Sequence, residues 1–472
     1  MNAVKPRRKL FELSHFNILL SMIVIFIHCS SIIMSGTQIG DRAFDAAFIP
    51  WRLSLFAVPG FIFLSGVKLF YNRSGKFDYI RFYRGRLTRV IIPYVVWVAI
   101  YYVYLTYTGE AVFSWSAFGH SLLYGDLTAH FYFVVIIAQF YILMPVWRFI
   151  FRRVTPSVAI LFSALISIIF GYEIMEVWLY FFPNTMFNFS AVIFTKYLLY
   201  WTCGCYVGMN YARFKEAVLK RKTAITILFI LCAALNLYLS YKTYNVGVNW
   251  MEYVQATYCL SAILFVFTFY CKLCERSERT TKITDMIDSQ CYNIFLSHCL
   301  VIMIAQDYLD SIGITDPVRV FWIVTLVTYS APLLFWSGWY WIKTGAVYLA
   351  RRIRARLKGE PLESKPPINK PEPERSARKK TPSGKTAANM TRAAGASSDT
   401  AVKPERRAAT AVKAAMSEKP ENNKSADKKS VNNKPANKKR AAAAKENKRA
   451  AGVSADTAVK SERYAARRRD ML

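Results

Sequence analysis

The sequence predicts an all-α, polytopic membrane helix bundle of about ten transmembrane helices, followed by a disordered basic tail. Of its 472 residues, 54% are hydrophobic and 15% are aromatic, which exceeds what a soluble core requires. Long apolar runs recur only in the first 350 residues, whereas 33 of the 62 basic residues lie in 351–472. The chain is therefore expected to divide into a membrane domain, 1–350, and a tail, 351–472.

Apolar runs of sufficient length define the predicted helices, because a helix needs about 20 mostly apolar residues to cross the hydrocarbon layer. The first run, 18–34, lacks a small-residue cleavage site and is expected to remain as a span. The predicted spans are 13–34, 48–70, 90–107, 131–150, 158–175, 191–210, 224–241, 251–270, 291–309 and 319–348.

Basic residues between these runs predict the orientation of the chain. Lys and Arg gather before the first span and after the second, fourth, sixth and eighth. The loops 108–130 and 171–190 contain neither, although they hold acidic residues, namely Glu110, Asp126, Glu173 and Glu176. Because short cytoplasmic loops carry the excess of Lys and Arg, both termini are predicted to be cytoplasmic.

The tail is rich in Ala, Lys, Asn, Pro and Ser, so it cannot bury enough apolar area to offset its chain entropy. It contains an internal repeat, since 392–409 returns at 449–466 with 14 of 18 positions identical. The positive charge of the tail favours attraction to anionic membrane lipids, or plain solvation, over binding to nucleic acid. The reason is that attachment of the tail at the membrane face already explains the charge.

Cysteine spacing predicts no metal site. The pair Cys203 and Cys205, and the pair Cys271 and Cys274, each resemble half of a zinc site, but no second half with ligand spacing follows. The nine cysteines lie in or beside apolar runs and are expected to be small buried side chains.

His28 is the clearest candidate for chemistry, because an ionisable residue inside a span costs about 2.5–3.5 kcal/mol. It lies in the run ILLSMIVIFIHCSS, late in the first span, and is expected in the outer half of the membrane. A neutral imidazole there can act as a general base on a hydroxyl or receive an acyl group itself. The alternative is a histidine that only bonds a neighbouring helix, and periodicity does not choose between the two.

Two more histidines and a carboxylate are candidate catalytic residues. His298 lies in the apolar run CYNIFLSHCLVIM, and His130 opens the fourth span. Asp126 stands four residues before His130, so on a helix that begins early the carboxylate shares a face with the ring and can orient it. The alternative is that Asp126 caps the amino end of that helix.

Arg84, Arg86 and Arg89 stand where a predicted cytoplasmic loop enters the third span. Guanidinium groups bind phosphate through two hydrogen bonds, so the cluster suits a phosphorylated carrier such as coenzyme A, which is available in the cytoplasm. The alternative is that these residues serve only as the topology signal.

Six segments occur in an order that is similar to acyltransferase family 3, the bacterial membrane O-acyltransferases that modify cell-envelope sugars. The resemblance extends over about 11–350. The segments are His28 late in the first helix, PGFIFLSG at 59–66, FYRGRLTRVIIPYVVW at 82–97, HFYFVVIIAQFYILMP at 130–145, KYLLYWTCGCYVG at 196–208 and YNIFLSHCLV at 292–301.

The resemblance implies a ten-helix bundle in the bacterial plasma membrane. Such a bundle takes an acyl group, expected to be acetyl, from acyl-CoA and transfers it to a hydroxyl of an envelope polysaccharide or lipid-linked glycan. In the family an arginine is followed by ten residues and then the histidine, and here that position is Asn17. The arginine's role must therefore pass to another cation or be absent.

The remaining family positions are filled. The resemblance implies a base or acyl-relay role for His28 and contacts with coenzyme A phosphates for Arg86 and Arg89, and His130 and His298 match later histidines of the family. Two other functions stay open: a polysaccharide transporter or export factor, and a membrane scaffold that acts through its basic tail. A transporter tends to show internal symmetry of broken helices, which this sequence lacks.

Overall fold

The structure is a computed structural model, and it describes residues 10–71, 77–172, 178, 180–182, 192–246, 251–276 and 282–357. The secondary structure within these ranges is helical throughout. Its elements are α1 (Phe11–Gly36), α2 (Arg42–Ser54), α3 (Ala57–Phe70), α4 (Tyr79–Arg86), the π-helix η1 (Leu87–Ile91), α5 (Ile92–Tyr107), α6 (Trp115–Tyr124), α7 (Tyr132–Ile142), α8 (Met144–Arg153), α9 (Pro156–Ser167), the π-helix η2 (Ile168–Tyr172), the 3₁₀-helix η4 (Phe194–Tyr197), α11 (Leu198–Met209), α12 (Tyr211–Lys220), α13 (Lys222–Val246), α14 (Met251–Arg276), α15 (Lys282–Ser311) and α16 (Pro317–Leu357).

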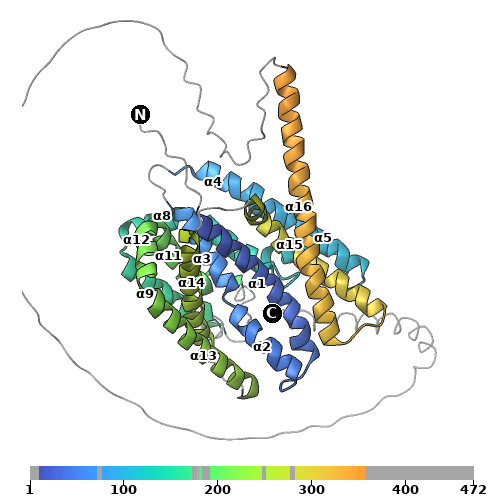
Figure 1. Cartoon of the computed structure of the whole chain (residues 1–472), viewed down its shortest axis with the longest axis horizontal. Helices are drawn as coiled ribbons and strands as arrows, with labels where there is room; N and C mark the ends of the chain where they lie inside the picture. Colours follow the sequence, from blue (N-terminus) through green and yellow to red (C-terminus); the bar gives the residue numbers. More distant parts are fainter. Residues whose placement is uncertain are drawn as a thin grey trace, which may run out of the picture. The chain divides into compact units, whose positions relative to one another are not determined.

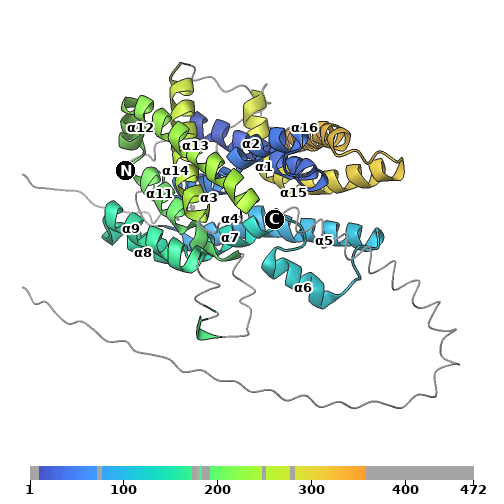
Figure 2. The same cartoon turned by 90° about the horizontal axis from the view of Figure 1, so that it is seen from below.

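Helix α1 is the central element of the bundle. It packs against α2, α3, α14, α15 and α16, and in Figure 1 it lies between α15 and α16 on one side and α13 and α14 on the other. Figure 2 shows α5 and α6 side by side, close to α7. A residue on α1 can therefore meet side chains from most of the bundle.

Glycines allow α3 and α11 to approach closely. A Cβ on Gly66 would lie 2.8 Å from the carbonyl oxygen of Trp201, and one on Gly208 would lie 2.6 Å from that of Val67. A Cβ on Gly204 would overlap the carbonyl oxygen of Phe63 more severely still. Small residues are typical of membrane helix interfaces, where close packing replaces the hydrophobic effect as the force that holds helices together.

Seven helical stretches are long and apolar enough to cross a membrane, and the bent pair α7 and α8 makes up to eight among the described residues. The two helices of that pair meet at 59°. The predicted span 158–175 corresponds to the shorter helix α9, which η2 continues. The predicted span 191–210 corresponds to η4, which α11 continues. Among the described residues, these two runs thus form helices shorter than a full span, and the other eight predicted spans correspond to the seven long stretches and the bent pair.

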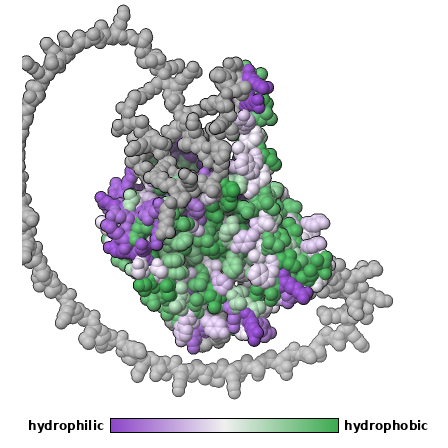
Figure 3. All heavy atoms as spheres, viewed as in Figure 1, coloured by the Kyte–Doolittle hydropathy of each residue, from purple (hydrophilic) through white to green (hydrophobic). Residues whose placement is uncertain are grey.

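The outer surface of the helices is apolar. Large hydrophobic side chains of α13 and α16 are exposed, including Ile227, Leu231, Leu326 and Leu334. In Figure 3, hydrophobic residues cover the middle of the visible face, and hydrophilic residues gather toward its ends. Exposed apolar surface of this extent suits contact with lipid, so the helices form a multi-pass membrane protein.

The predicted boundary between the membrane domain and the tail falls within α16. This helix continues from Pro317 to Leu357, seven residues past position 350. The tail beyond 357, its internal repeat and the basic residues before position 10 lie outside the described residues.

A buried carboxylate ties α1 to α12. Glu12 is 5% exposed, and its Oε1 accepts hydrogen bonds from the hydroxyl of Tyr211 (2.8 Å) and from Nζ of Lys215 (2.9 Å). Burial alone would lower the pKa of Lys215, but the hydrogen bond and charge of Glu12 raise it above the usual lysine value. Burial, together with the Glu12 charge, raises the pKa of Tyr211.

Replacing Lys215 with Met is expected to destabilise the chain by about 1.5 kcal/mol, because a buried carboxylate loses a charged donor. A pKa raised in the folded state means that this stabilisation is complete below the unfolded lysine pKa and is lost only above it. The difference in thermal midpoint between wild type and Lys215→Met should therefore be equal at about pH 6 and about pH 9. Lys220→Met, which removes an exposed ion pair, serves as the control and should change little.

Candidate active site

His28 lies on the inward face of α1, three turns after Asn17. It is 8% exposed, and its backbone carbonyl accepts a hydrogen bond from the hydroxyl of Ser31 (2.6 Å). Its Nδ1 is buried and has no hydrogen-bond partner among the described residues. Buried polar atoms nearly always form a hydrogen bond, so Nδ1 of His28 is a candidate to bond a molecule in the bundle.

Three histidines that are far apart in the sequence meet at this point. The ring centroids of His28 and His298 lie 5.1 Å apart, those of His130 and His298 lie 4.9 Å apart, and those of His28 and His130 lie 6.2 Å apart. They come from α1, from the turn before α7 and from α15. The three histidines proposed from the sequence thus form one buried cluster.

Hydrogen bonds assign the tautomer of His298, which is fully buried. Its Nδ1 lies 2.6 Å from the carbonyl oxygen of Phe295, and because a carbonyl only accepts, Nδ1 carries the proton. In the neutral ring Nε2 is then an acceptor, and the thiol of Cys299 lies 3.3 Å from it. Both nitrogens of His298 are therefore engaged by its own helix.

His130 contacts the hydroxyl of Thr128 and lies close to the backbone of Leu296. Its Nδ1 lies 3.1 Å from the hydroxyl of Thr128, and its buried Nε2 has no hydrogen-bond partner within the described ranges. The ring also lies against Tyr101, whose hydroxyl donates to the carbonyl of Leu296 (3.1 Å). His28 and His130 thus each keep one unpaired nitrogen, whereas His298 does not.

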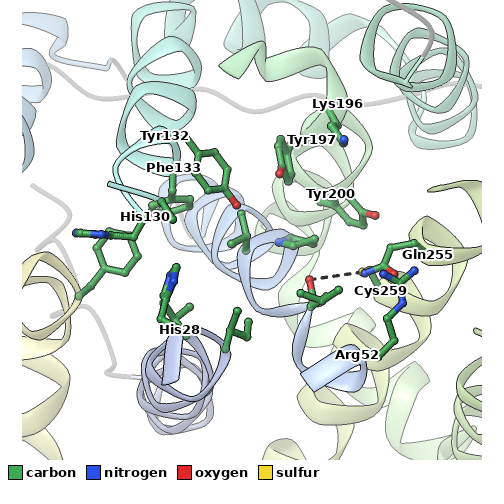
Figure 4. Close-up of a pocket in the computed structure, with 17 residues that line it drawn as sticks. His28, Arg52, His130, Tyr132, Phe133, Lys196, Tyr197, Tyr200, Gln255 and Cys259 are labelled. Atoms are coloured by element: carbon green, nitrogen blue, oxygen red, sulfur yellow. Dashed lines mark hydrogen bonds between the residues drawn. The ribbon is translucent and has the colours of Figure 1, made fainter. Parts of the chain in front are cut away.

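A cavity of about 560 Å³ adjoins the cluster, with His28 and His130 in its wall. In Figure 4 these two histidines lie at one side of the cavity, and Arg52, Lys196, Tyr200, Gln255 and Cys259 lie at the other. The volume is within the range of small-molecule sites, about 300–1,000 Å³. Apolar walls with a few polar groups are typical of such sites.

Arg52 and Lys196 line the cavity, but the sequence analysis did not single them out. Both stand in apolar runs, FIPWRLSLF and VIFTKYLLYW. The rule that selected His28, that an ionisable residue inside a span is a functional candidate, applies equally to them. Their charge within a run was the signal that could have found them.

The structure does not support the helical arrangement proposed for Asp126. Helix α7 begins at Tyr132, after both Asp126 and His130, so these two residues do not share a helical face, and the residue preceding α7 is Phe131. A carboxylate oxygen of Asp126 instead lies 3.2 Å from Nδ1 of His120. The run HFYFVVIIAQ is apolar enough to suggest an earlier start, but the chain turns at 127–131 before the helix begins.

The arginine cluster lies outside the cavity wall. Arg84 and Arg86 end α4 and Arg89 lies in η1, and none of the three lines the cavity. Arg84 and Arg89 are exposed, whereas the guanidinium carbon of Arg86 lies 4.6 Å from the ring centre of Tyr141. The two exposed guanidinium groups remain candidates for phosphate contacts.

Asn17, at the family's arginine position, joins α1 to α15. Its Nδ2 donates to Oδ1 of Asp288 (2.9 Å), and the hydroxyl of Ser14 donates to Oδ2 of the same residue (2.8 Å). Eleven residues separate Asn17 from His28, which is about 16 Å along a helix. Asn17 therefore acts through helix packing and does not reach the imidazole of His28.

Ligand atoms of His28, His298 and Cys299 lie within 4.8 Å of one another, close enough for a metal ion to join them. Cysteine spacing alone does not predict this group, because its ligands come from α1 and α15. Cys203, Cys205, Cys271 and Cys274 carry no disulfide. The expectation that the protein uses no metal stays a prediction.

Comparison with protein families agrees with this geometry. A family model described as an acyltransferase domain, Acyl_transf_3, matches residues 13–341, a range that contains His28, His130 and His298. Neither a curated protein nor a solved structure matches the chain significantly. Because the matched range includes more than half of the chain and the helices are those of a membrane protein, the chain belongs to acyltransferase family 3.

Proposed function

We propose that this membrane acyltransferase moves an acyl group, acetyl in the simplest case, from acyl-CoA to a hydroxyl of an envelope polysaccharide or lipid-linked glycan. The proposed location is the bacterial plasma membrane, with both termini in the cytoplasm. The observation that carries the proposal is the unpaired nitrogen of buried His28, in a residue that lines a cavity large enough for a sugar unit.

His28 can act in two ways. In the direct route, its imidazole removes the proton of the acceptor hydroxyl as the oxygen bonds to the thioester carbonyl carbon. The carbon–sulfur bond then breaks, and the imidazolium returns its proton to the departing thiolate. In the relay route, the unprotonated nitrogen of His28 bonds to the carbonyl carbon, the carbon–sulfur bond breaks, and the proton on the other ring nitrogen passes to the departing thiolate. The acceptor oxygen then bonds to the carbonyl carbon as the carbon–nitrogen bond breaks, and the hydroxyl proton returns to the imidazole.

The neighbouring histidines support His28 without duplicating it. The ring of His298 is fixed by its hydrogen bond to the carbonyl of Phe295, and this fixed ring lies against His28. The unpaired nitrogen of His130 is the second group at the cavity wall available for a hydrogen bond to the substrate. Fixed polar groups at a reacting centre stabilise developing charge without reorganisation.

The donor is proposed to bind at Arg84 and Arg89, with Arg86 beside them. Support comes from their exposure and from the match of guanidinium groups to phosphate. The pantetheine arm of coenzyme A is long and flexible, so phosphates bound at the loop are compatible with a thioester inside the bundle.

The test is to incubate membranes that contain the full chain with radiolabelled acetyl-CoA and to isolate the envelope glycans. Label that appears on glycan only when the chain is present is the expected result. Export of unlabelled glycan that depends on the chain would favour a transporter. Deleting 360–472 tests the scaffold function, because loss of all activity by an inserted protein would give the tail the main role.

A further inference from the structure

Two cations lie in the cavity wall opposite the histidines. Arg52 comes from α2 and Lys196 from η4, and Tyr200 and Gln255 stand beside them, as Figure 4 shows. The described residues that line the cavity include no Asp or Glu. Arg52 and Lys196 are therefore the charged side chains among the described residues of the cavity wall.

Arg52 and His28 lie at similar depth. Helix α1 ends at Gly36, and α2 begins at Arg42 and packs back against α1. His28 is eight residues before the end of α1, about 12 Å from it, and Arg52 is ten residues into α2, about 15 Å along that helix. The guanidinium and the imidazole thus belong to one level of the bundle, nearer to the turn between these helices than to the start of α1.

Cations at such positions are costly. Arg52 lies inside the candidate span Arg42–Phe70. Placing an arginine in the middle of a span costs about 2.5–3.5 kcal/mol, so such a residue normally faces a cavity that holds a polar ligand or lies on a substrate path. Here both side chains line the same cavity as the proposed base. Arginine binds carboxylate or phosphate through two hydrogen bonds, and lysine adds a point charge.

We propose that Arg52 and Lys196 bind a negatively charged group of the acceptor, a carboxylate or a phosphate, and so hold the hydroxyl to be acylated near His28. The inference rests on the proposed acyl transfer and deepens it by naming the acceptor as an acidic glycan. Gln255 and Tyr200 provide amide and hydroxyl groups for the neutral part of the sugar.

The donor phosphates are a second source of the same chemistry, but the position of the cations favours the acceptor. Coenzyme A carries its phosphates at the far end of the pantetheine arm from the thioester. Arg52 and Lys196 instead share one cavity with the histidines at which the thioester must react. The exposed Arg84 and Arg89 lie on other elements, outside that cavity.

The first arm of the test needs no variant. Membranes that contain the full chain are labelled with radioactive acetyl-CoA, and the labelled glycan is passed over an anion-exchange resin at neutral pH. Retention of the label, and its release by salt, is the expected result. Label on a glycan that flows through as neutral would overturn the inference while leaving acyl transfer intact.

The second arm compares Arg52→Gln and Lys196→Gln with wild type at saturating acetyl-CoA. Each variant is expected to lower the labelling rate by about 30-fold or more, the result of leaving one charge unpaired. The KM for acetyl-CoA should stay unchanged, and Arg52→Lys should restore part of the rate. Arg319→Gln, which removes an exposed arginine at the start of α16, is the matched control.

Each other outcome is decisive. A raised KM for acetyl-CoA in Arg52→Gln and Lys196→Gln would assign the two cations to the donor. Normal labelling rates in both variants would show that neither cation takes part in acceptor binding. Either result overturns the inference. Failure of wild-type membranes to incorporate any label would contradict acyl transfer itself, which is a different result from label on a neutral glycan.

Discussion

Replacement of His28 with Ala is expected to reduce glycan acylation by about 10²- to 10⁴-fold, the usual contribution of a positioned acid–base group. The reason is that His28 combines burial, an unpaired nitrogen and a place in the cavity wall. The rate of label transfer from acetyl-CoA, normalised to the amount of inserted protein, measures this loss.

His15→Ala is a matched control on the same helix. The Nδ1 of His15 bonds the carbonyl of Phe11 in its own helix, its ring stacks on Tyr270, and it does not line the cavity. Activity should therefore survive in His15→Ala. A His28→Ala protein that inserts and acylates at the wild-type rate would refute the mechanism.

The same variants separate the two routes proposed for His28. A relay predicts a covalent acyl-protein when acetyl-CoA is supplied without acceptor, and His28→Ala should lack it. A direct general base predicts no such intermediate in either protein. Mass spectrometry of the purified chain after brief exposure to labelled donor distinguishes them.

Replacement of Gly204 with Ala is expected to have the largest effect on stability. The added Cβ would overlap the backbone carbonyl of Phe63, and a backbone atom cannot rotate away as a side chain can. Overpacking typically costs about 1–3 kcal/mol, and a clash with backbone is expected at or above the upper end of that range. The thermal midpoint of the purified chain in detergent should fall accordingly.

Gly338→Ala supplies a control of opposite sign. Gly338 lies within α16, and a Cβ there would meet nothing within 4 Å. Alanine favours a helix over glycine by about 0.5–1 kcal/mol, so this variant should be as stable as wild type or slightly more stable. Equal destabilisation by the two substitutions would show that the α3–α11 contact does not decide the effect.

Apolar length predicted most helices but not their ends. The span expected at 291–309 belongs to a helix that begins at Lys282, because Asp288, too polar for an apolar run, is paired with Ser14 and Asn17. The span expected at 48–70 is divided between α2 and α3. Tertiary partners and breaks of this kind are not visible in hydropathy.

The site could be predicted in part. Each histidine was recognisable as a polar residue at an apolar run, but the convergence of His28, His130 and His298 depends on how α1 and α15 pack. The Asp126 arrangement assumed a helix that begins early, whereas α7 begins only at Tyr132. Arg52 stands near the start of the span predicted at 48–70, and its depth in the bundle depends on how α2 packs back against α1.

The close contact of α3 and α11 also bears on motion. The backbones of α3 and α11 approach so closely at Gly66, Gly204 and Gly208 that no side chain lies between them to yield, and we expect the two helices to resist sliding. The segment with Lys196 runs directly into α11, so we expect this side of the cavity to move together with α3. If the acceptor is the proposed glycan, its entry is expected to displace other walls, such as the turn at 127–131 that carries His130.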